Sequence, residues 1–148
     1  DREQVDPKYQ RPGEIVLALF EKKYYSELVQ PTFIVDYPRE TSPLAKGHRS
    51  DPALAERFEG VIMNMKVMNG YTELNDPRDQ RQRFEEQGKR ARRGDLSAMP
   101  HDQDFLRAME YGFPPMGGLG IGVDRMAMIL TDTQHIRDII LFPIVSER

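Results

Sequence analysis

Apolar positions along the first third of the chain change their spacing at Pro31. Between residues 14 and 30 they recur at helical spacing, which predicts an amphipathic helix that stops before the proline. Residues 32–37 are β-branched and aromatic and predict a strand. The polar segment 1–13 predicts a tail or linker, and residues 38–53, with three prolines, predict a long loop.

Two further runs, residues 57–63 and 67–74, predict strands that pair as a hairpin around Asn64–Met65. Helical segments follow over residues 77–93 and 102–111. An antiparallel hairpin with helices interspersed after it indicates the α+β fold class, an antiparallel sheet flanked by helices, rather than a doubly wound parallel sheet.

Composition narrows the function classes. The 148 residues are enough for one domain with a core of its own, and the absence of cysteine excludes disulfides, thiolate metal sites and a cysteine nucleophile. A net charge of −3 does not favour an overall basic, nucleic-acid-binding surface. No stretch approaches the roughly 18 apolar residues that a membrane span needs. We therefore expect a cytoplasmic protein with no membrane segment.

Glycines occupy every second position of a segment near the C-terminal end. Gly118, Gly120 and Gly122 would lie on one face of a strand, and the apolar residues between them would pack on apolar neighbours at the other face. A face without side chains lets a ligand lie directly against the sheet. Arg125 follows at the start of a predicted helix, where its guanidinium suits a phosphate. The alternative is a strand crossed closely by another backbone, with Arg125 in a structural salt bridge.

The segment GGLGIGVDR, with the apolar helix after it, resembles motif 3 of the class II aminoacyl-tRNA synthetases. The segments PTFIVDYPRETSPLAK, ERFE, NGYTELNDPRDQRQRFEEQ and IRDIILFP resemble the C-terminal part of the class II lysyl-tRNA synthetase catalytic domain. Together they cover roughly residues 15–148. The resemblance implies ATP, L-lysine and tRNA(Lys) as substrates, Mg²⁺ bound with ATP, and a homodimeric parent enzyme.

Asn69, Tyr71 and Glu73 share one parity on the second hairpin strand, so their side chains point to one face. A solvated strand face would show the same pattern. The resemblance assigns them to the lysine pocket: Glu73 binds the ε-amino group and Asn69 lines the pocket beside it. A pocket of this kind rejects apolar amino acids, because Glu73 would be left buried and unpaired.

The resemblance also implies a set of ATP-binding residues: Glu59, Lys66, Val67, Gly122, Val123, Asp124 and Arg125. Arg125 is the implied catalytic residue, which contacts the γ-phosphate, and Glu59 is an implied Mg²⁺ ligand. The family has a second metal-binding Glu at the position where this chain has Lys66. Either Lys66 neutralises phosphate in place of one metal ion, or the site is weakened and the chain does not retain full activity.

Motifs 1 and 2 and the anticodon-binding domain of the family are absent from this sequence. We therefore expect residues 14–148 to form the C-terminal part of a catalytic domain, with strands missing from its sheet and an exposed edge or face. The function implied is that of a fragment of an ATP-dependent lysine–tRNA ligase, inactive in isolation. Two alternatives stay open: a non-catalytic synthetase-like module that binds or regulates a partner, and a ligase that attaches lysine to elongation factor P.

The predicted helix over residues 77–93 carries seven basic residues. A basic stripe of this kind can bind tRNA phosphates, but a solvated helix face is the interpretation that we favour.

Overall fold

The computed structural model describes residues 11–95 and 98–144. Four antiparallel strands form one sheet in the order β1-β2-β3-β4. The strands are β1 (Thr32–Pro38), β2 (Leu54–Ile62), β3 (Met65–Thr72) and β4 (Gly117–Ile121). The α+β class and the antiparallel sheet predicted from the sequence are therefore confirmed for the described residues.

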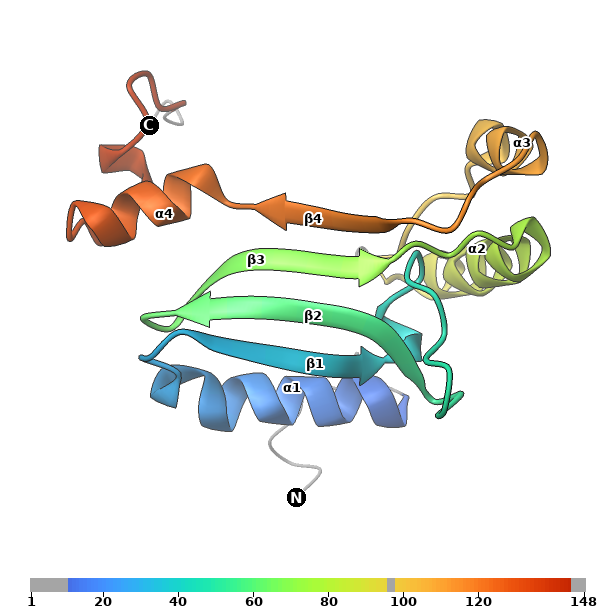
Figure 1. Cartoon of the computed structure of the whole chain (residues 1–148), viewed down its shortest axis with the longest axis horizontal. Coiled ribbons are helices and arrows are strands. Elements are labelled where there is room, and N and C mark those ends of the chain that lie inside the picture. The colour runs from blue at the N-terminus through green and yellow to red at the C-terminus, as the bar shows by residue number, and fades with distance from the viewer. Residues whose placement is uncertain (1–10, 96–97, 145–148) are drawn as a thin grey trace.

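Helices surround this sheet at one edge and at both ends (Figure 1). Helix α1 (Pro12–Tyr24) lies beside β1, α2 (Pro77–Arg92) and α3 (Gln103–Glu110) lie beyond the end of β3, and α4 (Val123–Leu130) follows β4 at the opposite end. Three short 3₁₀ helices complete the described elements: η2 (Tyr25–Glu27), η3 (Arg39–Thr41) and η4 (Ile136–Asp138). None of the described helices combines the length and the apolar character needed to cross a membrane.

The hairpin of β2 and β3 forms as predicted, with its turn one residue earlier than expected. Met63 and Asn64 both have positive φ, 49° and 63°. Positive φ at both central residues is the conformation of a two-residue type I′ turn, whose twist matches that of the flanking strands. Strand β3 accordingly ends at Thr72, and Glu73 follows it in an isolated bridge with Ala45.

The first helix starts and ends earlier than predicted. It begins at Pro12, because proline is favoured at the first helical position, so the predicted tail is wrong at residues 12 and 13. Residues 1–10 of that tail lie outside the described residues. Helix α1 ends at Tyr24 rather than at residue 30. The carbonyls of Leu28 and Val29 instead accept hydrogen bonds of 3.0 and 2.8 Å from the amides of the hairpin turn.

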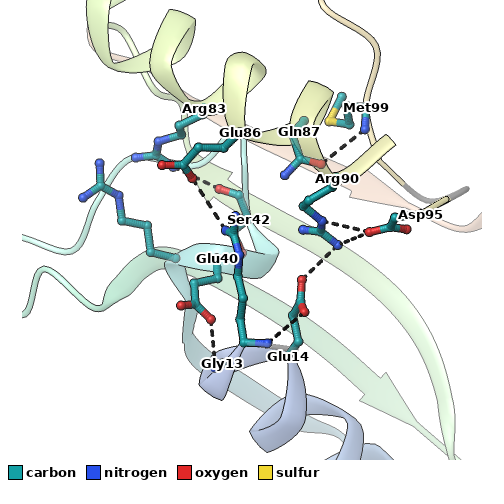
Figure 2. Close-up of polar contacts among 12 residues, drawn as sticks. Gly13, Glu14, Glu40, Ser42, Arg83, Glu86, Gln87, Arg90, Asp95 and Met99 are labelled. Carbon is teal, nitrogen blue, oxygen red and sulfur yellow. Dashed lines mark hydrogen bonds and ion pairs between the residues drawn. The ribbon is translucent and has the colours of Figure 1, made fainter. Parts of the chain in front are cut away.

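Charged side chains join the start of α1 to α2 (Figure 2). The Arg90 guanidinium lies 2.9 Å from Glu14 on α1 and 2.7 Å from Asp95. The amide of Gly13 donates a hydrogen bond of 2.9 Å to Glu40 in η3. These contacts bring the two ends of the polypeptide segment 13–95 together beside the sheet.

The interpretation of α2 as a solvated basic face is wrong for Arg83. Its side chain is buried and donates hydrogen bonds to the carbonyls of Ser42 (3.1 Å) and Ala45 (2.7 Å). Asp79, one turn earlier, pairs with the same guanidinium and has a lowered pKa because of it and of nearby Arg39. Arg83 therefore holds the predicted 38–53 loop against α2.

The sheet exposes apolar side chains on the face opposite the candidate site. Phe33 and Val35 of β1 are exposed, as are Leu119 and Ile121 of β4. The expectation that the apolar residues between the glycines pack on apolar neighbours is wrong, because no described element covers this face and β4 is an edge strand. The expected exposed face is confirmed.

Candidate active site

The functional candidates lie on one face of the sheet. Strand register places Arg57 opposite Tyr71 and Glu59 opposite Asn69, and residues opposite one another in a sheet share a face. A register shift between Gly60 and Val61 then places Lys66 opposite Val61, so its side chain also joins this face. The alternation predicted for the hairpin is confirmed.

The glycines of β4 continue the same face. Gly118 lies opposite Tyr71, and Gly120 lies opposite Asn69. Glu73 leans over Gly118 so closely that a Cβ atom there would overlap its Oε1. The bare backbone at Gly118 is therefore needed for the carboxylate of Glu73 to occupy this position.

Glu73 is a partly buried carboxylate whose pKa is raised above its ordinary value by burial alone. Among the described residues no cation pairs with it. The pKa of Tyr71 is raised by burial and by the charge of Glu73. We call Asn69, Tyr71 and Glu73 the carboxylate end of the site.

Glu59 has a different environment, with cations at both of its oxygens. Its side chain is 1% exposed, Arg57 donates to Oε1, and the Lys66 ammonium lies 2.7 Å from Oε2. The Lys66 contact is an ion pair without the direction of a regular hydrogen bond. Burial, together with the nearby Glu59 carboxylate, raises the pKa of Tyr37 strongly.

Arg57 links Glu59 to Asn69 and was not among the predicted site residues. It donates hydrogen bonds to Oδ1 of Asn69 (3.0 Å), to Oγ of Ser42 (3.1 Å) and to the carbonyl of Thr41 (3.2 Å). Its guanidinium also lies 4.6 Å from the centre of the Tyr37 ring. The sequence carried a signal for Arg57, because it has the same strand parity as Glu59.

Arg125 stands in the first turn of α4, beside Lys66. Its Nη1 donates a hydrogen bond of 2.6 Å to the Lys66 carbonyl, and its side chain packs over Gly122. The side chain is exposed, and within the described residues it forms no ion pair, so the structural salt bridge considered above is not seen. We call Lys66 and Arg125 the cation end of the site.

The other predicted ATP-binding residues offer fewer groups to a ligand, because one side chain is buried and two lie at the exposed start of α4. The Val67 side chain is buried, and its carbonyl accepts a hydrogen bond of 2.8 Å from the Gly122 amide. Val123 and Asp124 are exposed in the first turn of α4. Their contribution to a site is therefore limited to backbone groups and, for Asp124, an exposed carboxylate.

A hollow of about 750 Å³ opens at the cation end. Lys66, Arg125, Tyr25 and His135 are among its lining residues. The pKa of Tyr25 is raised to about 12, mainly by burial and by Glu59. Neither Tyr25 nor His135 was singled out from the sequence. Glu73 does not line this hollow, so the two ends share a sheet face without sharing this cavity.

Comparison with known proteins decides the family. A family model described as tRNA synthetases class II (D, K and N) matches residues 8–146. The chain belongs to this family. It is 56% identical over 88% of its length to the lysine–tRNA ligase of Gloeobacter violaceus, covering 26% of that protein. It is 57% identical over 88% of its length to the lysine–tRNA ligase of Aquifex aeolicus, covering 22% of that protein. It is 54% identical over 90% of its length to the lysine–tRNA ligase of Nostoc punctiforme, covering 24% of that protein.

These findings confirm the resemblance to class II lysyl-tRNA synthetases. The chain spans about a quarter of the length of the curated relatives that it matches. These relatives are enzymes named lysine–tRNA ligases.

Membership of this family raises the question of Mg²⁺, and the residues around Glu59 do not fit a divalent ion. Magnesium requires oxygen ligands at about 2.0–2.1 Å, whereas both Glu59 oxygens already contact cations. Two unit positive charges about 4 Å apart repel by about 4 kcal/mol at an effective dielectric constant of 20, and a divalent ion beside Lys66 would double this. Within the described residues no group of three acidic or histidine side chains could hold a metal ion.

Proposed function

We propose that the protein carrying this chain joins lysine to tRNA at the expense of ATP. In the first step, the lysine carboxylate attacks the α-phosphate of ATP, and the bond to the β-phosphate breaks to release pyrophosphate. In the second step, a terminal hydroxyl of the tRNA attacks the lysyl-adenylate and AMP leaves. The single observation that carries this proposal is the uncompensated Glu73 carboxylate on the site face of a chain whose relatives are lysine–tRNA ligases.

The carboxylate end supplies recognition of the amino acid. Glu73 pairs with the lysine ε-ammonium, which replaces the water lost on burial with a charge-assisted hydrogen bond. Because Oδ1 of Asn69 is already engaged by Arg57, its amide nitrogen is the group left to donate to the substrate. An apolar amino acid leaves Glu73 desolvated and unpaired, which disfavours its binding.

The cation end supplies charge neutralisation. Arg125 and Lys66 line one hollow, and both present positive charge to an anionic ligand there. Arg125 stabilises the departing pyrophosphate. No side chain serves as a nucleophile, so the chain acts by positioning the substrates and by electrostatic stabilisation.

The proposed position of Glu73 over Gly118 gives a first test. Gly118→Ala puts a methyl group where Oε1 of Glu73 lies, and the flexible carboxylate has to move. We expect the KM for lysine to rise about 10-fold, equivalent to roughly 1.4 kcal/mol, with little loss of thermal stability. Gly117→Ala is the matched control, because its Cβ meets nothing closer than 3.7 Å. Equal KM values for the two variants would contradict the proposed placement of lysine.

Lysine-dependent exchange between ATP and pyrophosphate tests the function as a whole. We expect the protein as its gene encodes it to catalyse this exchange with lysine, and the chain of residues 1–148 alone to catalyse none. Exchange with aspartate or asparagine instead of lysine would overturn the proposed specificity, and turnover by the isolated chain would overturn its expected inactivity. Lysine binding without exchange would favour a non-catalytic module. Transfer of lysine to elongation factor P instead of tRNA would favour the other ligase.

A further inference from the structure

The Lys66 ammonium at the cation end is held in place by two carboxylates. Lys66 lies 2.7 Å from Oε2 of Glu59 and 3.9 Å from Glu21 of α1. Glu59 is itself held by Arg57, and its 1% exposure leaves it no freedom to follow a moving partner. About a third of the Lys66 side chain is exposed, and this exposed part faces the hollow that Arg125 also lines.

The charge balance at this point differs from that of a metal site. A carboxylate pair would attract a divalent ion, but here one carboxylate is buried between two cations, and the second, Glu21, lines the hollow about 3.9 Å from the Lys66 ammonium. A lysine ammonium binds phosphate oxygens as a compact point charge. Lys66 is therefore suited to meet an anion directly, rather than through a metal ion bridging the anion to the protein.

We propose that Lys66 is a built-in cation for the triphosphate of ATP and takes the place of one divalent ion in this site. Glu59 holds the ammonium in position before the nucleotide arrives, and Arg125 meets the same triphosphate from the start of α4. Nucleotide binding at this site then depends less on divalent cations than it would with a carboxylate at position 66. This inference rests on the proposed function, because it assumes that the hollow receives ATP.

The test measures ATP binding by calorimetry in EDTA and in saturating MgCl₂, using the protein as its gene encodes it. The wild-type affinity should change by less than about 3-fold between the two conditions. Lys66→Glu should weaken ATP binding in EDTA by at least about 30-fold, the cost of replacing an attractive charge with a repulsive one, and MgCl₂ should restore most of it. Lys66→Gln removes the charge without adding a ligand, so it should weaken binding in both conditions.

Lys89→Glu is the matched control, because it makes the same change of charge at an exposed position of α2. It should leave ATP binding unchanged. Circular dichroism reports whether each variant is folded. Should Lys66→Glu fail to fold, Lys66→Gln and the wild-type comparison still decide the question.

Two results would overturn the inference. One is wild-type ATP binding that collapses in EDTA as strongly as that of Lys66→Glu, which would show that metal ions, not Lys66, carry the triphosphate. The other is unchanged ATP affinity in a folded Lys66→Gln variant, which would leave Lys66 as a structural partner of Glu59 alone. Both results leave the proposed ligase function standing if lysine-dependent exchange persists. Absence of ATP binding in every condition would overturn the proposed function as well.

Discussion

Glu73→Gln should raise the KM for lysine by about 100-fold in the lysine-dependent exchange reaction, equivalent to roughly 2.7 kcal/mol. The substitution keeps the shape of the side chain and removes the charge that pairs with the ε-ammonium. Stability should be unchanged or slightly higher. Burial raises the pKa of Glu73 in the folded protein, so its ionised form disfavours folding above its ordinary pKa, and glutamine removes this effect.

The pH dependence provides an independent measurement of the same charge. Lysine affinity should fall as the pH drops through the raised pKa of Glu73, because the protonated carboxyl no longer pairs with an ammonium. This titration should disappear in Glu73→Gln. Glu110→Gln, at an exposed position of α3, is the control and should change neither the KM nor the pH profile. A normal KM in Glu73→Gln would remove Glu73 from the lysine pocket.

Arg57→Ala should lower the free energy of unfolding by about 3 kcal/mol, because it leaves the buried Glu59 carboxylate with one of its cations missing. The same substitution frees Asn69 and removes the bonds to Ser42 and to the Thr41 carbonyl. Urea denaturation of the chain, followed by circular dichroism, measures the change.

Arg49→Ala is the matched control for this experiment. Arg49 is also within 2.7 Å of a glutamate, but its side chain is 82% exposed, and an exposed pair contributes about 0–1 kcal/mol. Arg57→Lys should recover only part of the loss, because an ammonium cannot reach all the acceptors that the guanidinium fork bridges. If Arg57→Ala lowers the free energy of unfolding by no more than Arg49→Ala does, Lys66 alone compensates the buried charge of Glu59.

The parts of the fold that sequence analysis predicted are those with local signals. Alternation along the second hairpin strand correctly placed Asn69, Tyr71 and Glu73 on one face, and the spacing of the two strands predicted the hairpin, with its turn one residue too late. The glycine repeat of β4 correctly placed Gly118 and Gly120 on one face of a strand, and the register then sets that face beside the carboxylate end. These features depend on backbone periodicity, which neighbouring residues determine by themselves.

The features that were missed depend on contacts between distant segments. The helix predicted to reach residue 30 ends early, because the turn of a hairpin formed more than 30 residues later engages the carbonyls of Leu28 and Val29. Arg83 is buried because the 38–53 loop places two carbonyls next to it, and Arg57 reaches both that loop and Asn69. The pattern of charged residues along a helix or strand cannot reveal these partners, because they lie in distant segments of the chain.

The candidate site extends along β3, so this strand sets the distance between the cation end and the carboxylate end. Lys66 and Glu73 are seven residues apart, at most roughly 23 Å at about 3.3 Å per residue, and the register shift beside Lys66 keeps both side chains on one face. A ligand pair that spans both ends has to meet near the middle, beside Asn69. Inserting or deleting one residue there would turn the side chains beyond it to the opposite side of the sheet. The geometry of the site therefore constrains the number of residues between Lys66 and Glu73.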